Sequence, residues 1–317
     1  MRVLITGVTG FVGPYLANEL AAEPEVELFG MAWNGNDHAT AALLPAGLET
    51  LTGDITDDGS IHEVLEAAKP QVVVHLAGAS SGAAAWRRPA ESLEINALGT
   101  LRLLEGIRRL GLDTTTIVAS SGEVYGSADD EAHPLTEDSP LRPLSPYAAS
   151  KASQDLVAAQ YPRAYGMRVI RLRLFNHTGP RHPEQFVASS FARQIARIER
   201  GLQEPVLEVG NLDARRDFVD VRDVARAYRL AVRSDVTGDV FNVCSGRAVS
   251  IRRILELLLG LARCEVVVHP DPERMRPADI PLLIGDPRRF REATGWVPEI
   301  PLEQTLSDLL DWWRDQP

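Results

Sequence analysis

The first half of the chain alternates short runs of β-branched and aliphatic residues with longer segments whose apolar residues recur at helical spacing. The short runs predict strands, because a strand that is buried on both faces reads as a continuous apolar run. The longer segments repeat with a period near 3.6, which is typical of helices that pack by one face. The predicted strands are Val3–Thr6, Val26–Met31, Val72–Leu76, Thr116–Ala119 and Val169–Leu174, and the predicted helices are Phe11–Ala22, Ser60–Ala68, Leu93–Leu110 and Tyr147–Tyr165.

This alternation predicts an α/β fold with a doubly wound parallel sheet, the Rossmann fold of nucleotide-binding proteins. We assign residues 1–175 to this NAD(P)-binding domain. Beyond it, loops rich in Pro and Arg separate shorter elements, so residues 176–317 are expected to form mainly a smaller, mixed α/β substrate-binding lobe. Two later segments, Phe218–Asp223 and Val240–Val243, are candidates for a return to the main sheet.

The composition narrows the class of protein. The chain has 317 residues and 44% hydrophobic content, which is ample for a large core. A net charge of -11 without any Lys/Arg run argues against nucleic-acid binding. No apolar stretch approaches the ~20 residues that span a bilayer, and the first one is too short for a signal peptide, so we expect a soluble, cytoplasmic protein. Cys244 and Cys264 lack Cys-x-x-Cys spacing; we interpret them as buried thiols and expect no disulfide or metal site.

A glycine-rich turn follows the first predicted strand. Gly7, Gly10 and Gly13 stand where this strand gives way to a helix. Glycine permits the tight turn and a close approach of the backbone to a pyrophosphate, which the helix N-terminus then faces. A plain tight turn is the alternative, but the position after the first strand favours a dinucleotide site. Phe11 and Val12 lie inside the turn and join the predicted cofactor contacts.

Other segments at strand ends extend this cofactor site. Asp54 and Ile55 follow the next β-like run and are candidates to cover an adenine. A buried strand ends at His75, which we interpret as a structural histidine. Asn96 lies on a predicted helix, where a structural role and a cofactor-side role fit the sequence equally. The loop after the buried strand adds Leu76, Ala77 and Gly78 to the predicted cofactor contacts.

The end of the second strand bears on the choice between NAD and NADP. An acidic residue there binds the ribose 2′-hydroxyl, and an Arg accommodates a 2′-phosphate. The chain has Ala32-Trp33-Asn34 at this place, and no Lys or Arg occurs between Arg2 and Lys69. Asn34 therefore joins the predicted cofactor residues, with Asp37 as an acid that a folded-back loop would bring in. The sequence predicts NAD(P)(H), with a slight preference for NAD.

Candidate catalytic residues lie further along the chain. Tyr147 and Lys151 are four residues apart and share one face of a helix. A nearby ammonium favours the phenolate, so we expect Lys151 to lower the pKa of Tyr147 and make it a proton donor or acceptor near neutral pH. Ser121 is expected to hydrogen-bond a substrate oxygen, with a strand-end turn as the alternative. Glu123 is either a base that removes a proton α to a ketone or an ordinary loop or substrate-orienting acid.

These motifs resemble the extended short-chain dehydrogenase/reductases that act on nucleotide sugars, over nearly the whole chain. The second half is more specific: it is similar to the GDP-mannose dehydratases and the GDP-6-deoxy-4-keto-mannose reductases, and most similar to the reductases. The segments that carry this resemblance are Phe175–Pro180, Phe186-Val187, Phe191–Gln194, Val209–Phe218, Phe241–Gly246, Arg276–Pro281 and Gly285-Asp286.

The resemblance implies that a GDP sugar binds in the second lobe. An Arg guanidinium binds a diphosphate in bidentate fashion, and an acid accepts hydrogen bonds from ribose hydroxyls or guanine N–H groups. We interpret Arg215, by contrast, as a member of a surface ion pair. The residues implied for substrate binding are Asn176, Val187, Arg216, Arg276 and Asp279, with Arg181 as a secondary candidate.

The activity that the resemblance implies is an NAD(P)H-dependent oxidoreductase of deoxysugar biosynthesis. It would reduce the 4-keto group of GDP-4-keto-6-deoxy-mannose to a GDP-6-deoxyhexose such as GDP-rhamnose, with Tyr147 giving the proton. Dehydratases of the family carry an acid or hydroxyl where this chain has Gly122, which favours the reductase. Glu123 keeps a GDP-mannose 4,6-dehydratase open, and a 4-epimerase or an inactive nucleotide-sugar-binding protein are further alternatives.

The resemblance also implies a homodimer through the helices near residues 93–110 and 147–165. Leu101, Leu104 and Ile107 are candidates for the apolar contact between subunits. The alternative for these three residues is the core of the protein itself, and helical spacing alone does not choose between the two.

Overall fold

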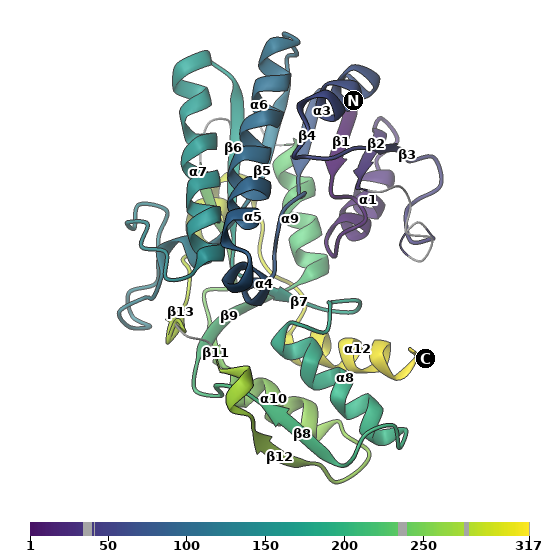
Figure 1. Ribbon diagram of the computed structural model, residues 1–317, viewed down its shortest axis with the longest axis vertical. Helices are drawn as coiled ribbons and strands as arrows, with labels where there is room; N and C mark the ends of the chain where they lie inside the picture. The colour runs from purple at the N-terminus through teal and green to yellow at the C-terminus, as the bar shows by residue number, and fades with distance from the viewer. Residues whose placement is uncertain (34–39, 41, 234–239, 276–278, 317) are drawn as a thin grey trace.

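The main domain is built on a seven-stranded parallel sheet. The computed structural model describes residues 1–316 except 34–39, 41, 234–239 and 276–278, and this sheet lies in the upper lobe of Figure 1. The strand order is β10-β6-β5-β4-β1-β2-β3, and every neighbouring pair is parallel. The chain adds strands on one side of β1 and then on the other, which confirms the predicted doubly wound fold. The strands are β1 (Arg2–Thr6), β2 (Glu27–Ala32), β3 (Glu49–Thr52), β4 (Val72–His75), β5 (Thr115–Ser121), β6 (Arg168–Leu174) and β10 (Val240–Val243).

Helices bury both faces of this sheet, which explains the continuous apolar runs in the sequence. Successive side chains of a strand point to opposite faces. In β1, Val3 and Ile5 pack into the core on one face, and Leu4 packs into the core on the other; all three are 0% exposed. The covering helices are α1 (Gly13–Ala21), α9 (Val221–Arg233) and α11 (Arg288–Thr294) on the first face and α3 (Asp58–Ala68), α6 (Gly99–Arg109) and α7 (Pro146–Tyr165) on the second.

The helix predicted over Leu93–Leu110 is interrupted near its start. A short helix, α5 (Pro89–Leu93), runs into a π-helical turn over Glu94–Leu98 before α6 begins. The π turn carries Asn96, which is 0% exposed. Single π turns inside helices are rare and often lie at functional sites. The sequence period does not reveal this turn, because one extra residue leaves the apolar pattern on either side intact.

The apolar residues of α6 that were candidates for a dimer contact belong to the protein's own core. Leu104 and Ile107 are 0% exposed, and Leu101 packs against the same cluster as Leu104. Of the two alternatives, the protein's own core is the correct one for Leu104 and Ile107, because the apolar face of the helix is turned toward the sheet and its neighbouring helices. Leu101 is only partly buried, and a dimer contact at this residue stays a prediction. The exposed apolar side chains on α7 are instead Leu156, which is 62% exposed, and Tyr165, which is 54% exposed.

The second lobe has small sheets and helices around a separate core. β9 pairs with β7, β11 and β13, and β8 pairs with β12. Cys244 is buried as predicted, but the prediction is wrong for Cys264, which follows α10 and is exposed. The elements are β7 (Asn176–Thr178), α8 (Val187–Glu199), β8 (Val206–Val209), β9 (Arg215–Asp220), β11 (Ala248–Ser250), α10 (Ile251–Gly260), β12 (Val267–Pro270), β13 (Leu282–Leu283) and α12 (Leu302–Arg314).

The chain passes between the two lobes more than once. Val240–Val243 forms β10 and pairs with β6 at the edge of the main sheet. Phe218–Asp223 does not return to that sheet: its first residues complete β9, and α9 begins at Val221. Because α9 packs on α1, this strand–helix step carries the chain from the second lobe back to the main domain.

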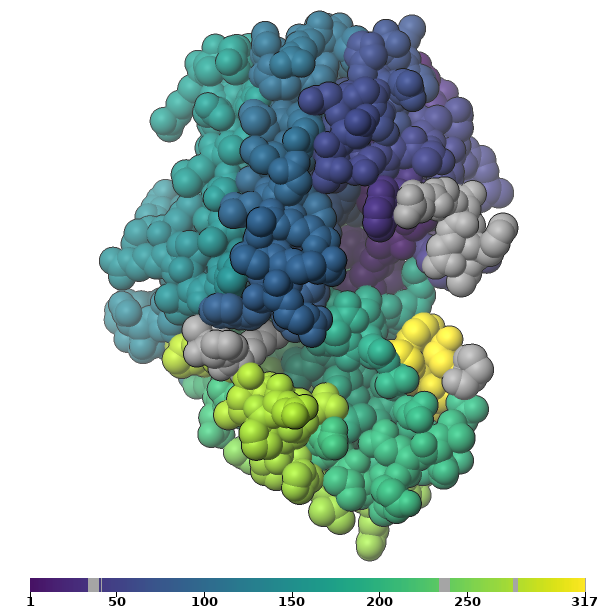
Figure 2. Space-filling model, viewed as in Figure 1, coloured from purple at the N-terminus to yellow at the C-terminus, as the bar shows by residue number. Residues whose placement is uncertain are grey.

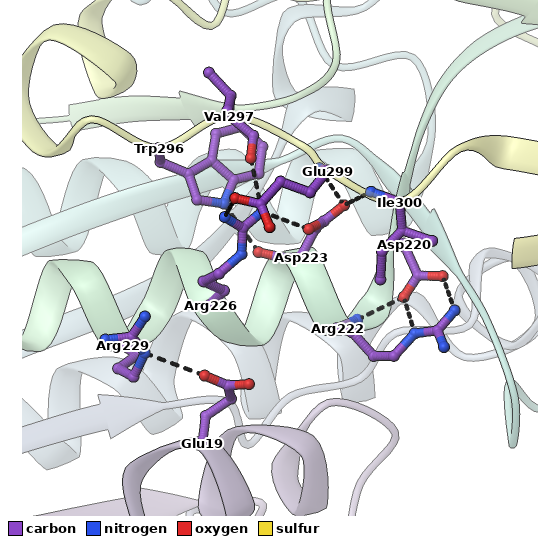
Figure 3. Close-up of polar contacts among 10 residues, drawn as sticks. All are labelled: Glu19, Asp220, Arg222, Asp223, Arg226, Arg229, Trp296, Val297, Glu299 and Ile300. Carbon is purple, nitrogen blue, oxygen red and sulfur yellow. Dashed lines mark hydrogen bonds and ion pairs between the residues drawn. The ribbon is translucent and has the colours of Figure 1, made fainter. Parts of the chain in front are cut away.

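Polar contacts around α9 fix the segment that leads to the C-terminal helix (Figure 3). The Asp223 carboxylate accepts hydrogen bonds from the backbone N–H groups of Glu299 and Ile300, each at 3.0 Å. The Trp296 indole donates to the Asp223 carbonyl at 3.0 Å. One turn further along α9, Arg226 pairs with the same carboxylate. A single buried acid thus holds the connection between the lobes.

No helix within the described ranges is long and apolar enough to cross a membrane. The longest of them, α7, has 20 residues. It carries Lys151, Asp155 and Arg163, so its composition differs from that of a membrane span.

Removing the Asp223 carboxylate should destabilise the protein strongly. Asp223→Ala leaves two backbone N–H groups without their acceptor and removes one of the partners of Arg226, which keeps Glu299 and the Val297 carbonyl; unsatisfied buried donors cost about 1–3 kcal/mol each. We expect the free energy of unfolding in urea to fall by roughly 2–4 kcal/mol. Asp213→Ala is the matched control, because Asp213 is exposed and pairs with Arg252 at the surface; its effect should stay within about 1 kcal/mol. Equal effects of the two changes would contradict this account.

Candidate active site

The glycine turn fits closely against the loop that follows β4. Gly7 has φ +69°, and a Cβ there would stand 2.8 Å from the backbone of Ala77. At Gly13 a Cβ would stand 2.1 Å from the carbonyl oxygen of Val8. Neither position has room for a side chain. The backbone of the glycine turn and the first residue of α1 therefore line the cavity. This is the arrangement that binds a pyrophosphate in doubly wound folds.

Asn96 and His75 hold the loop that follows β4. The Asn96 side chain forms two hydrogen bonds with the backbone of Ala79, at 2.9 and 3.1 Å, and donates to Ser150 at 2.8 Å. His75 lies between Thr6 and Thr100, is 0% exposed, and has a pKa that burial lowers to about 3. The structural interpretation of His75 is confirmed. The Asn96 side chain holds the loop after β4 through hydrogen bonds with the backbone of Ala79.

The two serines at the end of β5 point to different places. Ser120 is buried and donates to Asp155 at 2.7 Å. Ser121 lines the cavity, and its hydroxyl accepts from the backbone N–H of Glu123 at 3.1 Å, which caps a short 3₁₀ helix over Gly122–Tyr125. Both serines border the cavity, but alternation along the strand turns the Ser120 hydroxyl toward Asp155 and the Ser121 hydroxyl toward Glu123.

Tyr147 and Lys151 lie in the first turns of α7 and line the same cavity as Ser121. Ser145 caps this helix by accepting from the backbone N–H of Ala148, and Pro146 occupies its first position, which suits a fixed φ without an N–H. Helical spacing then places the phenol and the ammonium on the side that faces β5.

The prediction that Lys151 lowers the pKa of Tyr147 is wrong for this structure. Burial and the charge of Glu123 raise the pKa of Tyr147 above its usual value, and a hydrogen bond with Ser121 lowers it. Burial also lowers the pKa of Lys151 to about 8, against the charge of Asp155, which raises it. Tyr147 is therefore a protonated phenol at neutral pH, which suits a proton donor.

Asp155 anchors a buried charge cluster beneath the catalytic residues. It pairs with Arg171 at 2.7 Å and with Arg173 at 2.9 Å, in addition to Ser120. Burial raises the pKa of Asp155, but its hydrogen bond and charge pairing with Arg173 outweigh this and hold the pKa below its usual range. No local pattern in the sequence signals this cluster, since the arginines lie on β6 and only the packing of α7 on the sheet brings them to Asp155.

Substrate candidates in the second lobe meet at one wall of the cavity. Arg216 is buried, and its guanidinium lies 2.7 Å from the Asp279 carboxylate, which also accepts from Asn211 at 2.7 Å. The Asn176 side-chain oxygen is buried at the cavity and has no hydrogen-bond partner among the described residues. Arg216 and Asp279 thus form an ion pair, and both residues line the cavity.

Other predicted residues lie elsewhere. Arg181 is not among the residues that line the cavity; its guanidinium stacks over the ring of Tyr15 at 5.4 Å, and its assignment to the substrate stays a prediction. Arg215 pairs with Glu131 at the surface, as expected.

Some of the predicted cofactor residues do not line the cavity. Asp54 accepts hydrogen bonds from Thr56 and, like Ile55, Ala77 and Asn96, does not line the cavity. Asn34, Asp37 and Arg276 fall outside the described residues.

A stack of aromatic rings joins the glycine turn to the second lobe. The His182 ring lies 4.4 Å from Phe11 and 4.3 Å from Phe186, in stacked geometry on both sides. Burial lowers the pKa of His182 well below its usual value, so the stack is neutral. All three rings line the cavity. The sequence offered no signal for His182, and the structure adds Trp86 and Tyr228 as further cavity residues that were missed.

The cavity has a volume of about 760 Å³ and lies between the two lobes. Figure 2 shows the surface hollowed there, with the purple N-terminal segment at the back. Within the described part of the chain, no group of His, Cys, Asp and Glu side chains is arranged to hold a metal ion. The predicted residues that line the cavity are Gly7, Gly10, Phe11, Val12, Gly13, Leu76, Gly78, Ser121, Glu123, Tyr147, Lys151, Asn176, Val187, Arg216 and Asp279.

The doubly wound sheet, the glycine turn beside β1 and the Ser–Tyr–Lys set together define a short-chain dehydrogenase/reductase. A family model described as GDP-mannose 4,6 dehydratase matches residues 4–309, and the chain belongs to this family.

Individual relatives cover nearly the whole chain. GDP-6-deoxy-D-mannose reductase of Pseudomonas aeruginosa is 39% identical over 99% of this chain and 98% of its own length. A GDP-mannose 4,6-dehydratase of Vibrio cholerae is 32% identical over 98% of this chain and 92% of its own. The solved structure of RMD from Pseudomonas aeruginosa complexed with NADPH superimposes with a TM-score of 0.85, at 36% identity and 99% coverage of both chains.

The lowered pKa of Lys151 should appear in the pH dependence of stability. Between about 8 and the ordinary value of 10.5, the unfolded chain holds a proton on Lys151 that the folded chain has released. The free energy of unfolding therefore rises with pH through this window on account of this group. We expect urea unfolding to show the wild type gaining stability relative to Lys151→Met from about pH 8 to about pH 10. Lys69→Met, at an exposed lysine, should keep the wild-type trend, and a constant difference between wild type and Lys151→Met would refute the assignment.

Proposed function

We propose that this protein is an NAD(P)H-dependent reductase that converts the 4-keto group of GDP-4-keto-6-deoxy-mannose to an alcohol. Its product is a GDP-6-deoxyhexose such as GDP-rhamnose. The observation that carries the proposal is the hydrogen-bonded pair of Tyr147 and Ser121, in a cavity that Arg216 and Asp279 also line. The relative named as a GDP-6-deoxy-D-mannose reductase supports it.

The residues of the main domain fit a nicotinamide dinucleotide. Gly7 and Gly13 leave no room for side chains, so backbone N–H groups and the start of α1 can approach a pyrophosphate. When bound, the reduced cofactor supplies the hydride for the reduction. The sequence slightly favours NADH, whereas the related RMD structure contains NADPH, so both cofactors enter the test.

In this proposal the chain's own residues hold the carbonyl and deliver the proton. The Ser121 hydroxyl donates to the keto oxygen and orients it. As the carbonyl carbon is reduced, its oxygen gains negative charge and takes the proton of the Tyr147 phenol. The Lys151 ammonium would offset part of the negative charge of the phenolate as it forms, an effect smaller than those of burial and Glu123 on the phenol. The Tyr147 phenol is protonated at neutral pH and can give its proton to an oxygen that becomes an alkoxide, which is a much stronger base; its raised pKa makes it a weaker acid than a free tyrosine.

The second lobe supplies the groups that a GDP sugar requires. Arg216 lines the cavity and is oriented by Asp279, and a guanidinium is the side chain best suited to bind a diphosphate. The unpaired oxygen of Asn176 accepts from a sugar or ribose hydroxyl. An acidic protein that binds a dianionic ligand needs such a local concentration of positive charge. Val187, at the start of α8, adds an apolar contact.

The second candidate is a GDP-mannose 4,6-dehydratase with Glu123 as the base. The family model and the Vibrio cholerae relative favour it. Against it stands Gly122, where a Cβ would lie 2.9 Å from the ring of Phe175. The position therefore has no room for the acid or hydroxyl that the dehydratase resemblance requires, which supports the reductase.

The activity test follows absorbance at the NAD(P)H band. We expect purified protein to consume NADH or NADPH in stoichiometric amounts when GDP-4-keto-6-deoxy-mannose is added, and the two rates give the cofactor preference. Release of a 4-keto-6-deoxy sugar from GDP-mannose without added cofactor, together with no NAD(P)H loss, would instead establish the dehydratase.

Variants of the catalytic residues assign their roles. Tyr147→Phe should lower kcat by ~10²–10⁴-fold with little change in KM, since the phenol acts in the transition state. Glu123→Gln should keep reductase activity within about tenfold, because an orienting acid is not a base in this reaction. A loss in Glu123→Gln as large as that in Tyr147→Phe would contradict the reductase mechanism.

We further propose that the protein is a cytoplasmic homodimer that pairs through α7 and the neighbouring α6. The support is the family resemblance together with the exposed Leu156 and Tyr165 on α7, which would be covered in a pair of subunits. The core residues of α6 take no part in this contact.

The dimer can be tested by light scattering coupled to size exclusion. The wild type should elute at twice the chain mass, and Leu156→Arg should shift it toward the monomer, because the interface would then have to bury a charge. Leu202→Arg places the same charge on an exposed leucine of the second lobe and should leave the mass unchanged. A wild-type monomer, or equal behaviour of the two variants, would rule out this interface.

A further inference from the structure

Hydrogen bonds lead from Lys151 into the core of the main domain. The ammonium donates to the carbonyl of Ala119 at 2.8 Å and to the side-chain oxygen of Gln154 at 2.9 Å. The amide nitrogen of Gln154 donates to the Thr100 hydroxyl at 2.8 Å, and that hydroxyl lies 3.0 Å from the Nε2 atom of His75. Gln154, Thr100 and His75 are all 0% exposed, so these contacts do not exchange with solvent.

The hydroxyl of Thr100 decides which way the Gln154 amide points. It donates its proton to the carbonyl of Asn96 at 2.7 Å, so its lone pairs accept the other two contacts. The hydroxyl oxygen accepts one hydrogen bond from the amide nitrogen of Gln154. It accepts the other from Nε2 of His75, which must therefore carry a proton. The side-chain oxygen of Gln154 is therefore left to face Lys151.

The far end of this hydrogen-bond chain reaches the cofactor loop. Since His75 carries its proton on Nε2, its Nδ1 atom accepts from the Thr6 hydroxyl at 2.8 Å. Thr6 in turn accepts from the backbone N–H of Ala77 at 3.2 Å. Ala77 is the residue that Gly7 approaches most closely. Each side-chain nitrogen and oxygen along this path has at least one hydrogen-bond partner, which restricts its geometry.

We propose that Gln154 is a positioning residue for Lys151: its side-chain oxygen directs the ammonium toward the cavity and keeps it protonated during the reaction. The role of Lys151 in catalysis rests on the proposed function. The hydrogen bond between Lys151 and Gln154 is independent of that function. Lys151 and Gln154 are three residues apart and share one face of α7.

The remaining donor of the ammonium is available to the site. Ala119 and Gln154 take two of the three N–H groups in the described part of the chain. The Nζ atom lies beside Gly78, where a Cβ would stand 3.4 Å from it, and Gly78 lines the cavity. The two acceptors thus leave the third N–H for the cavity that Tyr147 also lines.

The charges around Lys151 set its protonation together with this contact. Asp155 on α7 raises the pKa of Lys151, whereas burial lowers it to about 8. His75 on β4 is neutral, and Tyr147 and Glu123 are the remaining titratable groups at this end of the cavity. A hydrogen bond that the charged form donates favours that form. Loss of the Gln154 oxygen should therefore lower the pKa of Lys151 further.

The chain contains only two lysines, Lys69 and Lys151, which makes a direct measurement feasible. Protein labelled with ¹³C at the lysine Cε should give two signals, and Lys69→Arg assigns them. We expect the Lys151 signal to titrate about one pH unit lower in Gln154→Met than in the wild type. Gln160→Met makes the same change at an exposed glutamine of the same helix and should leave the signal unmoved. This readout needs no substrate, so it stands even if the proposed reaction fails.

Gln154→Glu separates the contact with Lys151 from the contact with Thr100. Glutamate keeps an oxygen for Lys151 but loses the N–H that donates to Thr100. The Lys151 signal should therefore titrate with a midpoint at or above that of the wild type. A merely structural role would give both variants the same result. No shift in Gln154→Met, or equal lowering in both variants, would overturn the proposal. If Gln154→Met does not fold, the titration of Gln154→Glu decides alone. A titration midpoint of Lys151 below that of the wild type would then contradict the proposed role of Gln154.

The reductase assay gives the catalytic readout. In Gln154→Met the alkaline limb of the kcat profile should move to lower pH by the same amount as the NMR titration, with KM for the keto sugar unchanged. A matching shift ties the contact to catalysis. A shift in the NMR titration without one in the kcat profile would show that Gln154 positions Lys151 but that the reaction does not depend on it, which overturns the catalytic part of the proposal.

Discussion

Burial of polar and charged groups along one helix is the constraint on which the rest of the structure depends. α7 turns Lys151, Gln154 and Asp155 toward the sheet, where they are 6%, 0% and 0% exposed. An unpaired buried charge costs several kcal/mol, so each group has to meet a partner with good geometry. Arg173 on β6 and the Ala119 carbonyl on β5 provide such partners. The helix therefore fits the sheet in one position, and a shift by one residue would leave charges unpaired.

The same contacts locate the active site. Asp155 holds Ser120, which fixes the end of β5 and the direction of the next residue, Ser121. The π turn places Asn96 between the loop after β4 and Ser150 on α7. The glycine turn then packs against that loop, because nothing larger than glycine fits there. Three segments far apart in sequence thus take their positions from one helix, which is the preorganisation that proton transfer to a bound carbonyl requires.

The second lobe depends largely on a different set of contacts. Its main core shares no residues with the two large clusters of the main domain, and a smaller cluster that includes Ala152 of α7 and Leu283 of β13 joins the two lobes. Asp223 holds the segment that leads to its last helix, and the stack around His182 brings the glycine turn against the start of α8. The pairing of Arg216 with Asp279 orients a guanidinium before any ligand arrives. A fold of this kind can exchange one sugar nucleotide for another without disturbing the Ser–Tyr–Lys set.

The sequence by itself determined the parallel sheet, the glycine turn and the catalytic candidates, because strand and helix periods, glycine positions and the Tyr-x-x-x-Lys spacing are local properties of the chain. The tertiary structure alone decided what depends on neighbours distant in sequence. It placed Arg181 outside the cavity, Leu104 in the core and Gln154 against Lys151. It also reversed the expected shift in the pKa of Tyr147, since burial and Glu123 act on the phenol more strongly than spacing could show. Burial and electrostatics sum over the whole fold, and no periodicity along the chain encodes them.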